Sequence, residues 1–301
     1  MVETVAPRGL RGLSWKVELL VIGAVYGVYS LTRNLFGSAE VALGGVPYEA
    51  FRNAETIIRL EQALGLYVEP TVQAWFIDLR WFVQGLNAFY GIAHFAVTIG
   101  VLVVLFVRRP ELYPRARTML VTTTCVAIVG YALFPLMPPR LLDAPCPDGQ
   151  PPAVEFGGRC IASDLRSPGP DGVTADLWVA PFAADDTFGY IDTLAEVGGP
   201  WSFQSDAVTS VSNQYAAMPS LHVAWAAWSA LAVLPLARRG VGTALVLGYP
   251  TLTMFTIVVT GNHFWLDAVG GLIVLAVGWI TARLAHLHPR ADDGPGLPCP
   301  R

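Results

Sequence analysis

Two short segments near the C-terminal end place two histidines and an aspartate in otherwise apolar sequence. The first contains Ser220 and His222, and the second contains His263 and Asp267. Ionisable groups at the ends of membrane-spanning stretches are costly and usually functional. Because His263 and Asp267 are four residues apart, they share one face of a helix, and the carboxylate can hold the imidazole. A paired histidine with a second histidine nearby has the parts needed for covalent phosphoryl or acyl transfer.

The composition is that of an integral membrane protein. Of the 301 residues, 53% are hydrophobic and 14% are charged, whereas soluble domains carry roughly 25% charged residues. The net charge is −4 and the sequence has no basic run, so nothing indicates nucleic-acid binding.

Six stretches are apolar and close to the roughly 20 residues that cross the hydrocarbon of a bilayer. They are residues 15–31, 82–107, 119–137, 218–236, 241–260 and 264–287. The sequence therefore predicts an all-α membrane protein with six transmembrane helices.

Basic residues predict the orientation of these helices. They cluster before the first helix, between the second and third, between the fourth and fifth, and after the sixth. The residues are Arg8, Arg11, Lys16, Arg108, Arg109, Arg115, Arg117, Arg238, Arg239, Arg283 and Arg290. All four clusters fall on one side, which the positive-inside rule makes the cytoplasm. We expect a multi-pass plasma-membrane protein with both termini cytoplasmic, although a signal peptide cleaved within 37–39 is an alternative for the first stretch.

Two polar segments then lie on the extracytoplasmic side. In residues 37–80, apolar residues recur at helical spacing among charges, which predicts one or two amphipathic helices at the membrane interface. These residues are Phe51, Ala54, Ile57, Ile58 and Leu64, then Val72, Trp75, Phe76 and Leu79. Residues 138–216 form a long loop rich in Pro, Gly and Asp. We expect the helices and the loop to form an extracytoplasmic cap.

The loop also carries Cys146 and Cys160. Because disulfides persist outside the cytoplasm, we predict that these two pair, with two unpaired thiols as the alternative. Residues 1–288 are interpreted as a single membrane catalytic domain, and residues 289–301 as a disordered cytoplasmic tail.

The predicted topology brings an arginine to the same membrane depth as the histidines. Arg140 follows the third helix, His222 opens the fourth, and His263 opens the sixth, all at the extracytoplasmic face. A guanidinium binds phosphate through two parallel hydrogen bonds. Pro219 suits the first turn of a helix, whose free N–H groups attract anions. Each residue alone has an ordinary structural explanation, but their shared depth favours a phosphate site.

These motifs resemble the three signature blocks of the type 2 phosphatidic acid phosphatase superfamily. The blocks are Pro138-Pro139-Arg140, Pro219-Ser220-Leu221-His222 and His263-x-x-x-Asp267. The closer resemblance is to the inositol phosphorylceramide synthase-like branch, and residues 213–222 look much like its bacterial members. The resemblance covers most of the chain from the second helix onward. It implies a six-helix membrane fold and catalysis without a metal or another cofactor.

The resemblance also implies a role for each motif residue. His263 would be the nucleophile that forms a phosphohistidine, and Asp267 would orient it. His222 would protonate the leaving oxygen and then act as base on the acceptor, which agrees with the physical interpretation of the pair. Arg140 would clamp the phosphate, with Ser220 contributing a hydrogen-bond donor.

The chain departs from the wider superfamily at three places. Leu133 stands where a lysine is usual, Thr256-Ile257 where Ser-Arg is usual, and Leu221 where phosphatases often have glycine. Two phosphate-binding cations are therefore missing, which puts simple phosphatidic acid hydrolysis in doubt.

Another group must help to bind the phosphate. The candidates are Asn262, His94 and Arg80. The synthase-like branch has a histidine similar to His94. An equally good interpretation is that His94 is a buried structural residue bonded to a backbone carbonyl.

The sequence therefore predicts an enzyme that moves a phosphorylated headgroup between a lipid and an alcohol. The donor would be a phospholipid or a polyprenyl phosphate, and the acceptor a small alcohol such as inositol or a sugar. With water as acceptor, the enzyme would be a lipid phosphatase, but the long loop favours a shielded site and a transferase. A proton-coupled transporter and a lipid-binding scaffold are the alternatives from other classes. The sequence leaves the oligomeric state open.

Overall fold

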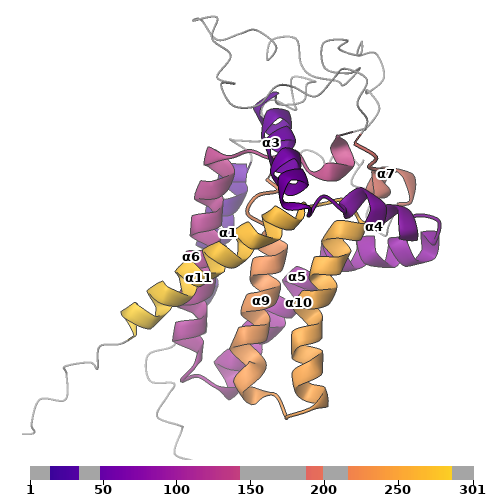
Figure 1. Ribbon diagram of the computed structural model, residues 1–301. Helices are drawn as coiled ribbons and strands as arrows, with labels where there is room; N and C mark the ends of the chain where they lie inside the picture. Colours follow the sequence, from indigo (N-terminus) through magenta and orange to yellow (C-terminus); the bar gives the residue numbers. More distant parts are fainter. Residues whose placement is uncertain (1–13, 34–47, 143–187, 199–215, 287–301) are drawn as a thin grey trace, which may run out of the picture.

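The computed structural model describes residues 14–33, 48–142, 188–198 and 216–286, and this part of the chain is helical (Figure 1). The α-helices in chain order are α1 (Trp15–Arg33), α3 (Tyr48–Leu64), α4 (Glu69–Phe76), α5 (Arg80–Arg108), α6 (Tyr113–Leu133), α7 (Thr193–Glu196), α9 (Leu221–Val233), α10 (Val241–Val259) and α11 (Trp265–Ala285). Two short 3-10 helices, η3 (Pro139–Leu141) and η6 (Leu234–Leu236), follow α6 and α9.

Four helices are long and apolar enough to cross a membrane. Their mean hydropathies are 2.3 for α5, 1.4 for α6, 1.6 for α10 and 1.8 for α11. The shorter apolar helix Leu221–Leu236, made of α9 and η6, packs against all four. Large apolar side chains on the outside, such as Leu133 (78% exposed) and Val241 (77% exposed), need a lipid environment. The protein is therefore a multi-pass integral membrane protein.

Prolines move two helix boundaries from their predicted positions. α6 begins at Tyr113, six residues before the prediction, because Pro114 fits its first turn. It ends at Leu133 instead of residue 137, since Pro135 follows directly and cannot continue the helix. α9 begins at Leu221 instead of 218, because Ser220 is its N-cap.

Small residues let α11 approach its neighbours closely. A Cβ added to Gly271 would lie 2.4 Å from the carbonyl oxygen of Ser220. A Cβ added to Gly278 would lie 2.6 Å from the carbonyl oxygen of Met119 in α6. Glycine at these positions brings α11 against α9 and α6, as small residues commonly do between membrane helices.

Helices α3 and α4 occupy the segment where amphipathic helices are predicted. The apolar face of α3 packs into the protein core and not onto an exposed surface. Its buried residues are Phe51, Ala54, Ile57 and Ile58, which pack around Phe264 at the start of α11. Leu64, Trp75 and Leu79 are exposed. The predicted helices are therefore present, but α3 uses its apolar face to cover the end of the bundle where α11 begins.

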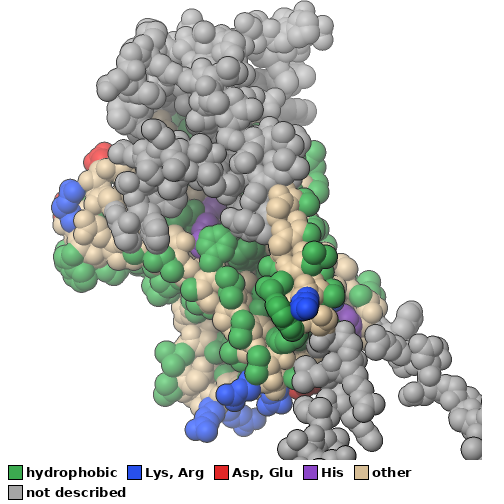
Figure 2. Space-filling model, turned by 180° about the vertical axis from the view of Figure 1, so that it is seen from behind, with side chains coloured by type: hydrophobic (Ala, Val, Ile, Leu, Met, Phe, Trp, Pro, Cys, Tyr) green, Lys and Arg blue, Asp and Glu red, His purple; other side chains and the backbone are tan. Residues whose placement is uncertain are grey.

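The opposite end of the bundle carries the arginine clusters. α5 ends at Arg108, α6 begins at Tyr113, and Arg238 lies between η6 and α10. Figure 2 shows Lys and Arg side chains gathered at the lower end of the molecule. There the buried Glu18 of α1 bonds to Arg117 and accepts a 3.0 Å hydrogen bond from the Tyr113 hydroxyl. Because both α1 and α6 begin at this end, the two helices run parallel.

Gly278→Ala should lower the melting temperature in detergent, because the new Cβ meets the Met119 carbonyl at 2.6 Å and overpacking typically costs about 1–3 kcal/mol. Gly100→Ala in α5 is the matched control, since nothing lies within 4 Å of an added Cβ there. The control should be unchanged or slightly stabilised. Equal melting temperatures for the two variants would contradict the close packing of α6 and α11.

Candidate active site

The predicted site residues lie at the end of the bundle covered by α3, where α6 and α10 end and α9 and α11 begin (Figure 1). The turn between α10 and α11 depends on Gly261, which has a φ of +66°. An added Cβ would also lie 2.9 Å from Nε2 of Gln73 and 3.3 Å from Cβ of Arg140. Glycine therefore fits both the backbone conformation and the close approach. The turn fixes the position of His263, which follows two residues later.

His263 and Asp267 form the hydrogen-bonded pair that their spacing predicts. Nδ1 of His263 lies 3.2 Å from Oδ2 of Asp267, and both side chains are buried. The same carboxylate oxygen accepts a 3.0 Å bond from the N–H of Phe264. With an ionised aspartate, Nδ1 carries the proton and donates it, so Nε2 of His263 keeps its lone pair.

His222 stands directly against this lone pair. Its Nδ1 lies 3.4 Å from Nε2 of His263. The His222 ring stacks on Tyr90, with centroids 4.1 Å apart, and meets His94 edge to face at 4.3 Å. These two aromatic contacts from α5 fix the plane of the His222 ring. The structure therefore brings together two histidines that are 41 residues apart in the chain.

Ser220 links the helices that carry the two histidines. It is buried, its Oγ caps α9 by accepting the N–H of Val223 at 3.5 Å, and its own N–H donates to the carbonyl oxygen of Asp267 at 2.9 Å. A capping hydroxyl still has a proton to donate. Ser220 can therefore offer a hydrogen bond beside His222 while holding α9 against α11.

Arg140 is held against the turn that precedes His263. Its backbone N–H donates to Gly261 at 2.8 Å, and its Nε donates to Oδ1 of Asn262 at 3.1 Å. Asn262 also donates through Nδ2 to Thr260 Oγ1 at 2.7 Å. Asn262 therefore contacts the arginine directly, so its amide fixes the direction of the guanidinium.

Asp192 is a partner of Arg140 that the sequence analysis missed. Its Oδ2 forms a 2.9 Å ion pair with a terminal nitrogen of the guanidinium. Its other oxygen accepts the N–H groups of Leu194 and Ala195 and caps α7. Asp192 lies in the long polar segment, which has no periodicity, so only the three-dimensional contact identifies it.

Amide side chains hold this part of the polar segment, residues 188–198, over the site. Gln73 of α4 bonds both to the N–H of Ile191 at 2.8 Å and to its carbonyl at 3.1 Å. Asn87 of α5 donates to the carbonyl of Thr193 at 3.0 Å. These bonds to the backbone on either side of Asp192 determine where its carboxylate lies.

Two further carboxylates bind the first turn of α11. Oε1 of Glu61 accepts the N–H of Leu266 at 2.9 Å, and Oε1 of Glu69 accepts the N–H of Trp265 at 3.1 Å. Both side chains are fully buried. The sequence contained a signal for Glu61, because it falls on the same face of its helix as Ala54 and the other apolar residues of α3. An acidic residue on an apolar helical face needs a partner in the core.

The surroundings of Glu61 favour its protonated form. Glu61 lies beside Glu69, and Oε2 of each has no hydrogen-bond partner among the described residues. Burial, together with the nearby charge of Glu69, raises the pKa of Glu61 from 4.5 to about 9. At neutral pH, Glu61 is therefore protonated beside the N-terminus of α11.

His94 has the contact expected of a structural histidine, a bond to a backbone carbonyl. Its Nδ1 donates to the carbonyl of Tyr90 at 2.9 Å, and its ring contacts His222 and Trp225. Arg80 donates instead to the carbonyl of Glu196 at 2.8 Å. Neither side chain has a recorded contact with Arg140 or His263.

The cysteines predicted to pair, Cys146 and Cys160, lie outside the described residues. Cys125 of α6 is a free and exposed thiol.

Comparison with known proteins identifies the family. The sequence profile of the PAP2 superfamily matches residues 55–281, which include every residue placed at the site above. The chain belongs to the PAP2 superfamily. No curated protein and no solved structure matches the chain.

Family membership establishes the general activity. This PAP2 protein is a metal-independent phosphatase or phosphotransferase that acts on phosphate esters, typically those of lipids. The prediction of an enzyme is confirmed, and family membership disfavours the transporter and scaffold alternatives.

Glu61→Gln should flatten the dependence of stability on pH. A raised pKa means that the folded protein holds the proton more tightly than the unfolded chain does. Its stabilisation is complete below pH 4.5 and is lost as the pH rises towards about 9. Glutamine keeps an acceptor for the Leu266 N–H but cannot ionise. The melting temperature of the variant, measured in detergent, should therefore fall less than that of the wild type across this range.

Glu111→Gln is the control, because Glu111 is an exposed residue between α5 and α6. It should keep the slope of the wild type. A Glu61→Gln curve parallel to that of the wild type would contradict the raised pKa of Glu61.

Proposed function

We propose that this protein transfers a phosphorylated headgroup from a lipid to an alcohol through a phosphohistidine at His263. The observation that carries the proposal is the chain of contacts from Asp267 through His263 to His222. It leaves one nucleophilic nitrogen of the carboxylate-bonded histidine 3.4 Å from a second imidazole. Nucleophile, orienting carboxylate and acid–base group are the parts that covalent phosphoryl transfer requires.

In the first step, Nε2 of His263 attacks the phosphorus atom and the bond from phosphorus to the lipid oxygen breaks. The electron pair of that bond stays on the lipid oxygen, which takes a proton from protonated His222 and leaves as an alcohol. In-line attack places phosphorus between the nucleophile and the leaving oxygen. Substrate must therefore separate the two imidazole rings that are in contact in the free protein.

In the second step, an acceptor hydroxyl attacks the phosphohistidine. His222 removes the proton of the acceptor while the bond between nitrogen and phosphorus breaks, which returns His263 to its starting state. Asp267 stabilises the positive charge on the His263 ring during both transfers, as a buried carboxylate does for a catalytic imidazole.

We assign phosphate binding to Arg140 and Ser220. Arg140 contacts the two residues before His263, and Ser220 is the N-cap of α9, two residues before His222. Asn262 and Asp192 contact the guanidinium itself. In this proposal they are positioning residues, and His94 supports the ring of His222.

The acceptor is proposed to be an alcohol, in line with the inositol phosphorylceramide synthase-like motifs. Residues 188–198 of the long polar segment are bonded over the site, which favours exclusion of water. A phospholipid or polyprenyl phosphate would be the donor, and inositol or a sugar the acceptor. The second candidate is a lipid phosphate phosphatase, in which water resolves the same intermediate.

The proposed topology has six spans, with α1 and α9 added to the four helices that are long and apolar enough to cross a membrane. The parallel course of α1 and α6 supports it, because helices that are first and third in a bundle of six both run outward. The arginine clusters lie at the end opposite the site, which supports an extracytoplasmic active site under a cap in the plasma membrane. Residues 1–288 would form one catalytic domain with a disordered cytoplasmic tail.

A radiolabelled lipid phosphoester should leave an acid-labile, base-stable label on the purified protein, because phosphohistidine has these properties. His263→Ala should abolish the label, and His222→Ala should slow its formation or its release. His286→Ala is the matched control, since His286 lies at the opposite end of the bundle beside Thr118. Turnover should survive metal chelation, and a strict magnesium requirement or a label that persists in His263→Ala would contradict the mechanism.

Asp192→Ala should lower kcat about tenfold or more, because Arg140 loses a charge-assisted hydrogen bond of roughly 1.5–3 kcal/mol. KM should not rise, since the removed carboxylate competes with phosphate for the guanidinium. Asp192→Asn should recover part of the rate by accepting the same bond. The exposed Glu196→Ala in the same segment is the control, and a loss confined to KM would argue against a positioning role.

A further inference from the structure

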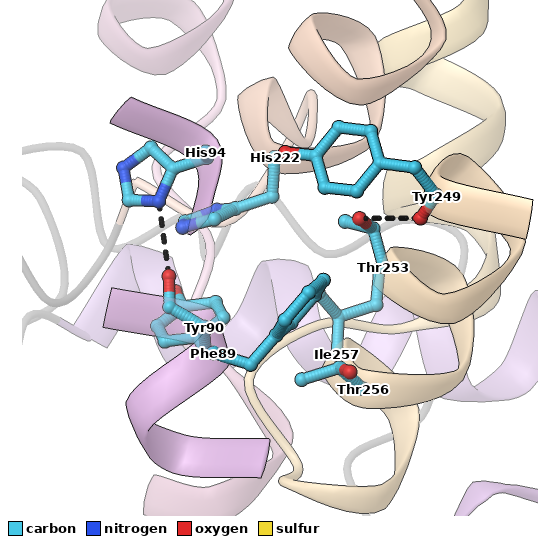
Figure 3. Close-up of a pocket in the computed structure, with 8 residues that line it drawn as sticks. All are labelled: Phe89, Tyr90, His94, His222, Tyr249, Thr253, Thr256 and Ile257. Atoms are coloured by element: carbon cyan, nitrogen blue, oxygen red, sulfur yellow. Dashed lines mark hydrogen bonds between the residues drawn. The ribbon is translucent and has the colours of Figure 1, made fainter. Parts of the chain in front are cut away.

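A small pocket lies between α5 and α10, with His222 at its edge (Figure 3). Its walls are largely carbon, contributed by side chains such as Phe89 and Ile257. No lysine or arginine lines it, and Arg140 is bonded elsewhere, to the turn after α10 and to Asp192. The pocket therefore suits a neutral group better than a phosphate.

One hydroxyl in this pocket differs from its neighbours on the same helix. Thr251, Thr253 and Thr260 of this region each donate to the carbonyl four residues earlier, at 2.7–3.0 Å. Threonines in apolar helices usually satisfy their hydroxyls in this way. The hydroxyl of Thr256 is buried but has no hydrogen-bond partner among the described residues, and Thr256 lines the pocket.

Tyr249 provides a second hydroxyl in the pocket. Its phenol oxygen is buried, and its one recorded neighbour for hydrogen bonding among the described residues is Thr253, whose own hydroxyl donates to the Tyr249 carbonyl. Figure 3 shows the Tyr249 ring reaching from α10 toward His222. A buried hydroxyl without a partner costs roughly 1–3 kcal/mol. The unpartnered Thr256 hydroxyl, with the Tyr249 hydroxyl in the same pocket next to the proposed acid–base residue, indicates a ligand that supplies oxygen atoms.

The depth of the pocket indicates which part of the substrate enters it. Thr256 and Tyr249 lie three and ten residues before the end of α10 at Val259. At 1.5 Å per residue, these positions are about 5 and 15 Å below that end of the helix. The pocket therefore lies inside the bundle, on the side of the site that faces the apolar interior of the membrane.

We propose that this pocket binds the alcohol end of the lipid, with the hydroxyls of Thr256 and Tyr249 bonded to its oxygen atoms. The inference rests on the proposed function, in which His222 protonates the oxygen that leaves phosphorus. That oxygen becomes the hydroxyl of a long-chain alcohol when its bond to phosphorus breaks and His263 takes the phosphoryl group. The lipid alcohol is then released on the membrane side of His222, while the phosphoryl group stays near Arg140.

Equilibrium binding of two lipid alcohols in mixed micelles of fixed composition tests this proposal. Dioleoylglycerol is the alcohol of a phospholipid donor, and undecaprenol is that of a polyprenyl phosphate donor. We expect one of them to bind the wild type saturably. Thr256→Val and Tyr249→Phe should each raise its Kd about tenfold, the change that loss of one ordinary hydrogen bond brings. Whichever alcohol binds identifies the class of donor.

Thr251→Val is the matched control, because Thr251 is an exposed threonine of the same helix whose hydroxyl bonds to Leu247. Its Kd should equal that of the wild type. The proposal is overturned if neither alcohol binds, or if Thr256→Val leaves the Kd unchanged. It is also overturned if Thr256→Val weakens inorganic phosphate binding by the same factor, since the hydroxyl would then serve the phosphoryl group.

The outcome is separable from that of the proposed function. Suppose that Thr256→Val weakens alcohol binding but the wild type shows no labelled histidine. The pocket would then still be the lipid site, and the phosphohistidine mechanism would be rejected. A labelled His263 with unchanged alcohol binding would keep the mechanism and reject this pocket as the lipid site.

Discussion

The structure depends on how the backbone N–H groups in the first turn of α11 find hydrogen-bond acceptors inside an apolar bundle. The backbone N–H groups of residues 264–266 donate to carboxyl oxygens of Asp267, Glu69 and the protonated Glu61. A helix N-terminus carries a partial positive charge, so buried anions there are stabilised. The same turn positions His263, and one of the three carboxylates bonds to its imidazole. The geometry of the proposed nucleophile is therefore set by the capping of a helix.

Around this turn, the two sides of the site differ in chemistry. On one side, Arg140 is fixed by Asn262 and Asp192, and the backbone beside Asp192 is held by Gln73. On the other side, His222 borders a largely apolar pocket lined by the hydroxyls of Thr256 and Tyr249. A charged half and an apolar half match a substrate with a phosphate at one end and a hydrocarbon tail at the other. The two histidines stand at the boundary, where the bond to be broken would lie.

Local spacing made part of this site predictable from the sequence. His263 and Asp267 are one helical turn apart, so their spacing in the sequence is enough to predict their contact. Hydropathy indicated the helices that carry them. Helix boundaries shifted where prolines and caps override hydropathy, as at the start of α6. Asp192 could not be predicted, because its pairing with Arg140 depends on where a long polar segment crosses the site. Glu61 was detectable as an acidic residue on an apolar face, but its partners in α11 lie about 200 residues away.

The central claim is that Arg140, His222 and His263 act on one phosphorus atom, and a structure with orthovanadate bound tests it most directly. Vanadate adopts the trigonal bipyramidal geometry of a phosphoryl group in transfer. The account predicts a vanadium atom bonded to Nε2 of His263, an equatorial oxygen on the Arg140 guanidinium, and His222 beside the apical oxygen. Vanadate bonded to another residue, or held at His263 with Arg140 still turned away toward Asp192, would contradict it.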